Sequence, residues 1–324
     1  MTVPLRIAVA LCTYNGARYI SAQLESLLAQ TQLPAQIVVS DDGSADSTRT
    51  KAAEVLSRTA VAVLWQEHRP ALGVTENFES AVRAADADLI ALCDQDDVWH
   101  PKKLALLTRV FESDPSALFV FTDASLIDGN GGDLGRGLFE SLGVSESELS
   151  MIEAGNALPV FLRRNIATGA TVVFRRELLQ LALPFPPSWV HDEWLATVAA
   201  LHGGVRVLRE KTIDYRQHGD NQIGVSERTL TYKLRRMLAP RRSRNSELAR
   251  KFSDLEARFA RSNLSREHLA LLYHKARFER ARAGMPRHRL LRVPSVVVLA
   301  AQGCYSQFAS QGMLDIFRDL LQPA

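Results

Sequence analysis

The first 225 residues alternate short apolar runs with stretches of helical periodicity, and this alternation restricts the possible folds more than any other feature of the chain. The predicted strands occupy residues 6–12, 36–41, 60–66, 88–94, 117–128 and 205–210. Between them, apolar residues recur three and four positions apart, as in amphipathic helices. Strands with two apolar faces belong in a mostly parallel sheet that helices cover on both sides. The sequence therefore predicts an α/β domain over residues 1–225.

Residues 226–324 form a second region, helical in periodicity and basic in charge. It holds 20 Lys and Arg against 8 Asp and Glu, a balance of +12, whereas residues 1–225 carry −9. Basic amphipathic helices suit an anionic membrane surface, and equally a solvated face. Nucleic acid is not an expected partner, because aromatic residues are sparse and no zinc, helix-turn-helix or RNA-binding signature is present. The sequence makes no prediction of oligomeric state.

No segment predicts export or membrane spanning. Residues 1–15 lack the basic start and long apolar core of a secretion signal, and the apolar segment 293–313 is interrupted by polar residues. Of the three cysteines, Cys12 and Cys93 lie in apolar strands, which suits free thiols in a reducing compartment. We expect a cytoplasmic protein, peripheral on the inner face of the cell membrane if its basic helices bind lipid.

Polar residues follow the predicted strands at their carboxyl ends, where parallel sheets bind ligands. Asn15 follows the first strand, and Asp41 and Asp42 follow the second. In "LCDQDDVW", Asp94 and Asp96 come directly after the fourth strand. These positions predict a binding site along one edge of the sheet. Asp41 and Asp42 precede Gly43 and also suit a simple turn.

The residues Asp94 and Asp96 alternate along the chain, so their side chains can converge while Asp97 turns elsewhere. Two carboxylates about 4 Å apart repel by roughly 4 kcal/mol at an effective dielectric of 20, which favours a cation between them. Oxygen donors with no Cys or His at ligand spacing nearby indicate Mg²⁺ or Mn²⁺. The alternative is a solvated acidic turn in which Asp97 caps the helix starting near Pro101.

Several segments together resemble the GT-A domain of glycosyltransferase family 2, in particular bacterial enzymes that build cell-surface polysaccharides, including rhamnosyltransferases. They are "VALCTYNGARYISAQLESLLAQT", "IVVSDDGSADST", "GVTENFESAVRAADADLIALCDQDDVW", "TGATVVFRREL", "HDEWLA" and "YRQHGDN", in the family's order over residues 5–225. The resemblance implies a Rossmann-like GT-A fold and inverting sugar transfer from a nucleotide-diphosphate donor, such as dTDP-rhamnose or a UDP-hexose. It implies a lipid-linked or cell-surface polysaccharide acceptor.

The resemblance also implies roles for individual residues. Asp192 matches the catalytic base, although His191 departs from the usual pattern, and Glu193 is the reserve base; Asp192 equally suits a helix N-cap. Asp94, Asp96 and His218 would hold the metal. Arg216 and His218 would approach the diphosphate, unless "YRQHGDN" is only a polar turn. The full set implied at the donor site is Thr13, Tyr14, Asn15, Asp41, Asp42, Gly73, Asn77, Asp94, Gln95, Arg216 and His218.

The sequence leads to three further expectations, on a loop, on the tryptophans and on rival functions. Residues 129–156, rich in Gly, Ser and acids, predict a long mobile loop with at most one helical turn, suited to a lid. Trp99, Trp189 and Trp194 suit the core as well as a sugar platform. The rival functions are a nucleotidyltransferase, although no Gly-rich basic phosphate loop opens the chain, and a non-catalytic module that binds sugar nucleotides or scaffolds a membrane complex.

Overall fold

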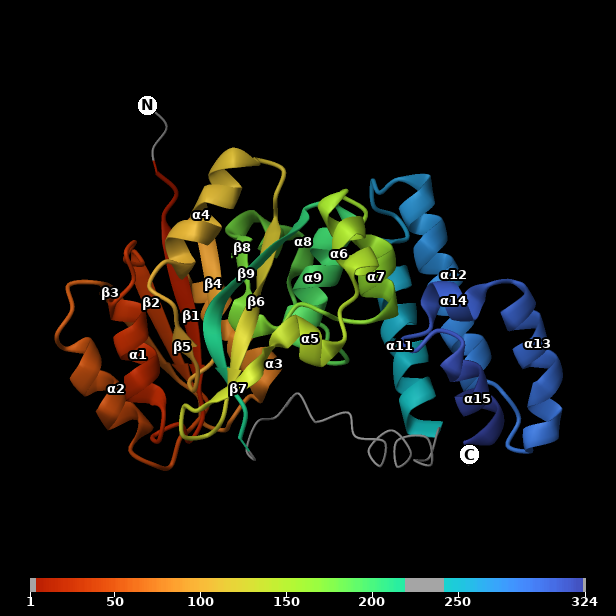
Figure 1. Ribbon diagram of the computed structural model, residues 1–324, viewed down its shortest axis with the longest axis horizontal. Coiled ribbons are helices and arrows are strands. Elements are labelled where there is room, and N and C mark those ends of the chain that lie inside the picture. The colour runs from red at the N-terminus through yellow and green to blue at the C-terminus, as the bar shows by residue number, and fades with distance from the viewer. Residues whose placement is uncertain (1–3, 219–241, 323–324) are drawn as a thin grey trace. The chain divides into compact units, whose positions relative to one another are not determined.

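The computed structural model describes residues 4–218 and 242–322, and these divide into two compact units (Figure 1). The first unit takes its residues from Met1–Ala157 and Ile166–Val225, and the second from Leu158–Asn165 and Ser226–Ala324. Segment 158–165 thus groups with the C-terminal helices, a detail absent from the predicted division. The predicted boundary between residues 225 and 226 lies outside the described residues and stays a prediction.

Within the described residues, the first unit is built on a sheet with the strand order β3-β2-β1-β4-β8-β6-β9-β5, with β7 paired to β6. Strands β1 to β4 are mutually parallel, as predicted, whereas β8, β5 and β7 pair antiparallel with their neighbours. The bounds are β1 Ile7–Thr13, β2 Gln36–Asp41, β3 Ala62–Glu67, β4 Leu89–Cys93, β5 Val98–Trp99, β6 Phe119–Ile127, β7 Asp133–Gly137, β8 Val173–Arg175 and β9 Val205–Arg216.

Alternating side chains of the strands support helices on both faces of the sheet. Ile7, Val9 and Leu11 of β1 belong to a core cluster that includes Leu24 and other residues of helices α1, α2 and α4. On the opposite face, α3 packs against β1, β2 and α9. The bounds are α1 Ile20–Leu28, α2 Thr48–Leu56, α3 Val74–Ala84, α4 Lys103–Ser113, α8 Leu179–Ala182 and α9 His191–Leu201. The predicted α/β class is confirmed.

The prediction of a mobile loop over residues 129–156 is wrong. This segment contains strand β7 and helices α5 (Leu138–Leu142) and α6 (Glu146–Glu153). Ser145 and Glu148 form a reciprocal capping box that starts α6, which the pattern Ser-x-x-Glu permits. The Arg209 guanidinium ties α6 to β9 through Glu146 at 2.6 Å and Glu153 at 2.7 Å. The polar composition of this segment did not reveal these elements, because its polar residues form a helix cap and ion pairs.

The second unit is helical, as predicted for the C-terminal region. Its described elements are α7 Leu158–Arg163, α11 Arg242–Phe259, α12 Arg266–Ala283, the 3₁₀ turn η3 Arg289–Arg292, α13 Val293–Ala301, α14 Cys304–Phe308 and α15 Leu314–Leu321. Phe278, Val296, Tyr305 and Phe308 centre its small apolar core. No helix in the described parts of the chain is both long and apolar enough for a bilayer crossing.

Candidate active site

The carboxyl ends of β1 and β2 form the first part of the site. Thr13 pairs with Asp41 in the parallel register, and its hydroxyl donates a 2.7 Å hydrogen bond to the Asp41 carboxylate. Asp41 also accepts from the Ser44 backbone N–H at 2.8 Å and from its hydroxyl at 2.6 Å. Asp41 therefore orders the turn after β2, as the turn-forming alternative anticipated, while its carboxylate stays at the predicted edge.

Asp42 fixes the start of helix α3. Its two carboxylate oxygens accept from the backbone N–H groups of Leu72, at 2.6 Å, and Gly73, at 2.9 Å. Gly73 has φ +83°, a left-handed conformation that favours glycine. Asn77 is buried, and its amide exchanges hydrogen bonds with the Ser40 hydroxyl and carbonyl. Asn77 thus braces β2 from inside, while Gly73 shapes the loop at the rim.

The loop after β1 is held by Gln95, which lies between two of the acids. The Tyr14 N–H donates to Gln95 Oε1 at 2.8 Å, and Gln95 Nε2 donates to the Tyr14 carbonyl at 3.0 Å. A Cβ on Gly16 would collide with the end of the Gln95 side chain, so a larger residue there would displace Gln95 from Tyr14. Asn15, with φ +50°, accepts from the Ala45 N–H at 2.8 Å. The Tyr14 side chain itself is half exposed at this edge.

The acid cluster after β4 contains charges that repel one another. Burial, together with the charges of Asp96 and Asp192, raises the pKa of Asp94 to about 7, and the charge of Lys103 acts in the opposite direction. Burial likewise raises the pKa of Asp97, with Asp96 and Asp94 adding to the effect. The charge of Asp192 thus acts on Asp94, although about a hundred residues of sequence separate the two acids.

Asp97 does not cap the following helix, which was the alternative that the sequence left open. It is almost fully buried, and its Oδ1 accepts from the Arg216 backbone N–H at 2.9 Å. Its Oδ2 has no hydrogen-bond partner among the described residues. Helix α4 begins at Lys103 and has Lys102 as its N-cap, with no side-chain cap bond.

The end of β9 brings two more predicted residues to the cluster. His218 Nε2 lies 2.7 Å from Asp96 Oδ2, and the Arg216 Nε donates to the Asp96 carbonyl at 2.7 Å. Tyr19 supports both: its ring centroid lies 5.0 Å from that of His218 and 4.7 Å from the Arg216 guanidinium carbon. Strand β9 is longer than the predicted run 205–210, and this extension delivers Arg216 and His218 to Asp96.

Asp192 lies inside the first turn of α9 and is not its N-cap, which is Val190. Its Oδ2 accepts from the Gly169 N–H at 2.9 Å and its Oδ1 from the Glu193 N–H at 2.6 Å. His191 is buried and stacks on Phe78 with 3.8 Å between ring centroids. Burial lowers the pKa of His191 to about 3, so its ring is neutral near pH 7.

Lys103 is the site residue that the sequence analysis missed. It is fully buried, donates to the Ala170 carbonyl, and its Nζ lies 3.6 Å from the centroid of the Trp99 ring. Burial lowers its pKa to about 7, while Cys93, Asp97 and Asp94 favour the charged form. The signal was present: Lys103 lies four residues before Leu107 and eight before Phe111, on the apolar face of α4.

The site offers carboxylates and one imidazole, but not a ready coordination cage. Within residues 4–218 and 242–322, no group of three or more His, Cys, Asp or Glu side chains is arranged to hold a metal ion. Trp99, Trp189 and Trp194 are buried in the core, so they are not sugar platforms. The edge of the sheet therefore carries acids that repel one another, and the charge of Lys103 offsets this repulsion only in part.

Comparison with known proteins identifies the family. The model for "Glycosyl transferase family 2" matches residues 8–180, which is more than half of the chain. The chain belongs to glycosyl transferase family 2. An uncharacterised glycosyltransferase of Nostoc sp. is 30% identical over 224 residues, which are 67% of this chain and 66% of the relative. The chain therefore matches just under two thirds of that relative's length.

This family 2 member is also similar to two proteins whose names state an activity. The dTDP-rhamnosyl transferase RfbG of Shigella flexneri is 24% identical over 229 residues, covering 67% of this chain and 74% of RfbG. The mannosyltransferase PcManGT of Pyrobaculum calidifontis, solved in complex with GDP-Man and Mn²⁺, superposes with a TM-score of 0.51 at 19% identity, covering 93% of this chain and 77% of PcManGT. At that identity the likeness concerns the fold alone.

Proposed function

We propose that this chain is a metal-dependent, inverting glycosyltransferase that moves one sugar from a nucleotide-diphosphate donor to a lipid-linked or cell-surface polysaccharide acceptor. The observation that carries the proposal is the repulsion of Asp94 by both Asp96 and Asp192, beside the 2.7 Å contact of His218 with Asp96. These residues come from three separate strand and helix ends of a family 2 domain. Clustered groups with perturbed pKa values mark functional sites.

The donor set fits a hard divalent ion in its chemistry. Asp96 and His218 provide an oxygen and a nitrogen 2.7 Å apart, and Asp94 is the third proposed ligand. Mg²⁺ and Mn²⁺ commonly use one or two protein carboxylates and leave other positions to water and substrate phosphates. When bound, such an ion supplies charge stabilisation to the departing diphosphate without a proton. A cation there also offsets the repulsion that raises the pKa of Asp94.

The proposed donor pocket is the edge formed by β1 and β2. Tyr14 offers an exposed ring to the base, and Asn15, Thr13, Asp41 and Asp42 order the surrounding turns. Gly73 leaves open space at the rim, since a Cβ there would meet nothing within 4 Å. Gln95 and Asn77 position this pocket through the hydrogen bonds described above, and Arg216 faces the diphosphate end.

The proposed chemistry is a single displacement. Asp192 accepts the proton of the acceptor hydroxyl as that oxygen bonds to the anomeric carbon, and the bond from that carbon to the diphosphate oxygen breaks. The backbone N–H groups of Gly169 and Glu193 orient the Asp192 carboxylate. Neutral His191 beside it adds no positive charge. Of the named relatives, RfbG supports dTDP-rhamnose as the donor, and a UDP-hexose is the alternative.

The test is a panel of nucleotide sugars assayed with and without Mn²⁺ or Mg²⁺, for hydrolysis and for transfer to a lipid-linked glycan. We expect metal-dependent release of a nucleoside diphosphate, lost in Asp96→Asn and kept in Asp133→Asn, which alters an exposed acid of β7. Release of pyrophosphate would instead indicate a nucleotidyltransferase. Tight nucleotide binding without any turnover would indicate a non-catalytic module.

A further inference from the structure

Helix α15 buries its charged residues and exposes three of its apolar ones. Asp315 and Asp319 are fully buried and Arg318 nearly so, whereas Leu314, Phe317 and Leu321 are 62%, 54% and 55% exposed. A helix on the surface of a protein in water normally shows the opposite arrangement. The outward face of α15 is therefore built for an apolar neighbour.

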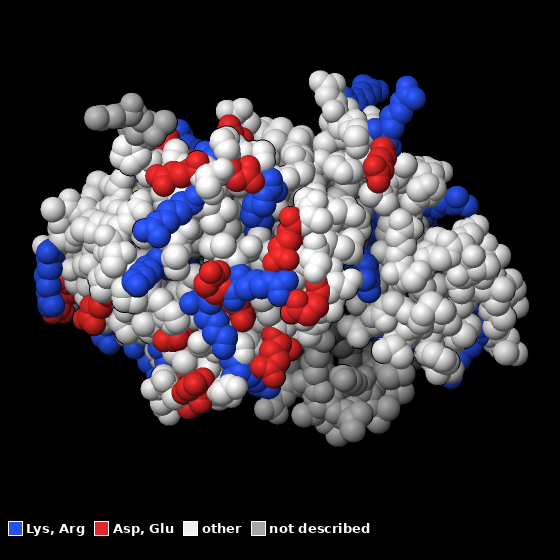
Figure 2. Space-filling view, turned by 45° about the horizontal axis from the view of Figure 1, so that its top comes forward, with Lys and Arg blue, Asp and Glu red and all other residues white. Residues whose placement is uncertain are grey.

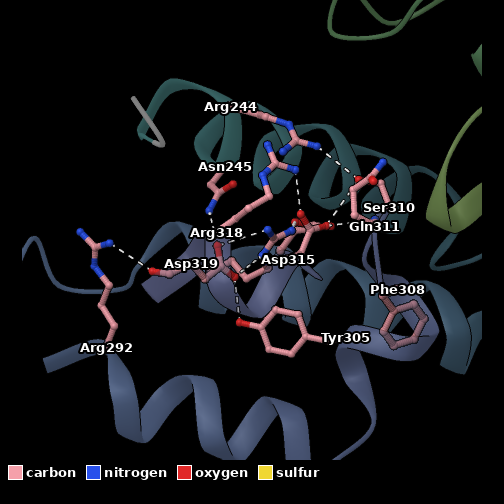
Figure 3. A network of polar contacts seen from close by, with 12 residues as sticks. Arg244, Asn245, Arg292, Tyr305, Phe308, Ser310, Gln311, Asp315, Arg318 and Asp319 are labelled. Atoms are coloured by element: carbon pink, nitrogen blue, oxygen red, sulfur yellow. Dashed lines mark hydrogen bonds and ion pairs between the residues drawn. The ribbon is translucent and has the colours of Figure 1, made fainter. Parts of the chain in front are cut away.

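A polar network fixes which face of α15 points inward (Figure 3). Arg318 pairs with Asp315 at 2.7 Å, and Asp319 accepts from Arg282 at 2.7 Å and from the Tyr305 hydroxyl at 2.8 Å. Arg292 donates to the Asp319 carbonyl at 3.1 Å. Turning α15 to hide its leucines would break these bonds and leave buried charges unpaired. The exposure of the apolar side is thus a consequence of the internal structure.

The apolar surface continues onto η3 and α13, which contact α15 and each other. Leu290 and Leu291 of η3 are 73% and 64% exposed, and Val293 and Val297 follow one another by one helical turn on the outside of α13. The resulting apolar face consists of Leu290, Leu291, Val293, Val297, Val298, Met313, Leu314, Phe317 and Leu321. At the right-hand end of Figure 2, where Figure 1 shows α13, few charged side chains reach the surface.

The exposed charges on the segment that carries this apolar face have one sign. Between residues 286 and 322 the acids are Asp315 and Asp319, both buried in ion pairs. The exposed ionisable side chains of the same segment are Arg287, His288 and Arg289. An apolar surface with a cationic border complements the acyl chains and phosphates of an anionic bilayer. A second copy paired about a two-fold axis would bring the same cations together without acids to neutralise them.

We propose that the apolar face is a membrane-docking surface, inserted at the boundary of headgroups and acyl chains of an anionic bilayer, with Arg287 and Arg289 on lipid phosphates. This inference identifies the residues through which the proposed enzyme would bind a membrane. The apolar side chains would insert into the bilayer, and the basic side chains would bind lipid phosphates at the border. It does not depend on catalysis. Docking by this surface keeps the enzyme on the membrane that carries a lipid-linked acceptor.

The test measures co-flotation of the full chain with vesicles of phosphatidylcholine alone and with about 30% phosphatidylglycerol. We expect binding to the anionic vesicles, weakened about tenfold or more by Phe317→Glu and by Val297→Glu, because each places a charge in the inserted surface. Arg289→Glu tests the charge separately and is expected to weaken binding less. Tyr273→Glu on α12 removes an aromatic side chain of similar exposure, 48%, and is expected to change binding less than about twofold.

Several results would overturn the docking surface. Absence of wild-type binding, or equal binding by wild type and Phe317→Glu, contradicts it. If Phe317→Glu converts a dimer to a monomer and leaves vesicle binding unchanged, the apolar face is an interface with a second copy of the chain. Unfolding by Phe317→Glu and Val297→Glu assigns it to burial within the chain. Metal-dependent donor hydrolysis in the absence of vesicles, measured on the same samples, separates these failures from a failure of the proposed function.

Discussion

Both units bury carboxylates, but they treat them in opposite ways. In the C-terminal unit, Glu279 pairs with Lys275 and Asp319 pairs with Arg282. Burial alone would raise the pKa of Asp315, yet the charges of Arg282 and Arg318 outweigh it and lower that pKa. At the sheet edge of the first unit, burial and neighbouring acids raise the pKa of Asp94, with Lys103 as a partial counterweight.

This difference in pKa distinguishes buried charges that stabilise the fold from buried charges that are available to bind a ligand. A buried ion pair whose partners are all supplied by the chain holds helices in place, and removal of one partner is costly. Carboxylates that repel one another reduce stability, and a chain retains them where a bound cation or substrate offsets the repulsion. Substitutions in the first unit should therefore cost activity, and substitutions in the second should cost stability.

The largest expected effect is on the chemical step. Asp192→Asn should lower kcat for transfer by about 10³-fold, because the amide cannot accept the hydroxyl proton. Donor affinity should change little, since the proposed base does not contact the nucleotide. Steady-state kinetics and donor titration measure the two quantities, and Glu193→Gln on the next residue is the matched control. A greater loss of kcat in Glu193→Gln would move the base to Glu193.

The next effect is on stability in the other unit. Asp319→Asn should lower the free energy of unfolding by about 3 kcal/mol, because Arg282 would lose its charged partner within a buried network. Urea unfolding measures this change, and Asp133→Asn at an exposed position should change stability by less than about 0.5 kcal/mol. Equal stability of Asp319→Asn and wild type would show that the network in α15 is dispensable.

A smaller effect concerns pH. The folded-state pKa of Asp94 is about 7, above the ordinary value of 3.8, so the folded state binds the extra proton between these values. Stability should then fall as pH rises from about 4 to 7 in metal-free buffer, because the unfolded chain releases this proton at lower pH than the folded chain does. Asp94→Asn should flatten that slope, as measured by urea unfolding at several pH values. An identical slope in wild type and Asp94→Asn would assign it to other groups.

The alternation of strands and helices predicted the sheet of the first unit because period and composition report burial directly. It also predicted which residues follow the strands, so Asp94 and Asp41 were expected at the correct edge. Lys103 was missed because a lysine on an apolar helix face usually extends its charge to water, whereas here the charge lies beside Trp99. The fold of residues 129–156 was missed because caps and ion pairs with Arg209 depend on distant contacts.

The proximity of Asp192 and His218 to the cluster could not follow from spacing, since it depends on the turn at Gly169 and on the length of β9. The resemblance to a family supplied those residues as candidates, and the structure supplies their arrangement. The outward apolar side of α15 is likewise absent from the sequence pattern, because amphipathic periodicity identifies two faces of a helix but not which one points inward.

The central claim is that the acids at the sheet edge hold a divalent cation together with a nucleotide diphosphate. The most direct test is titration of the full chain with Mn²⁺, followed by electron paramagnetic resonance, with and without UDP or dTDP. We predict one bound Mn²⁺ per chain that tightens with nucleotide, weakened about tenfold or more in Asp96→Asn and unchanged in Asp133→Asn. Equal Mn²⁺ binding by wild type and Asp96→Asn, or none with either nucleotide, would contradict the claim.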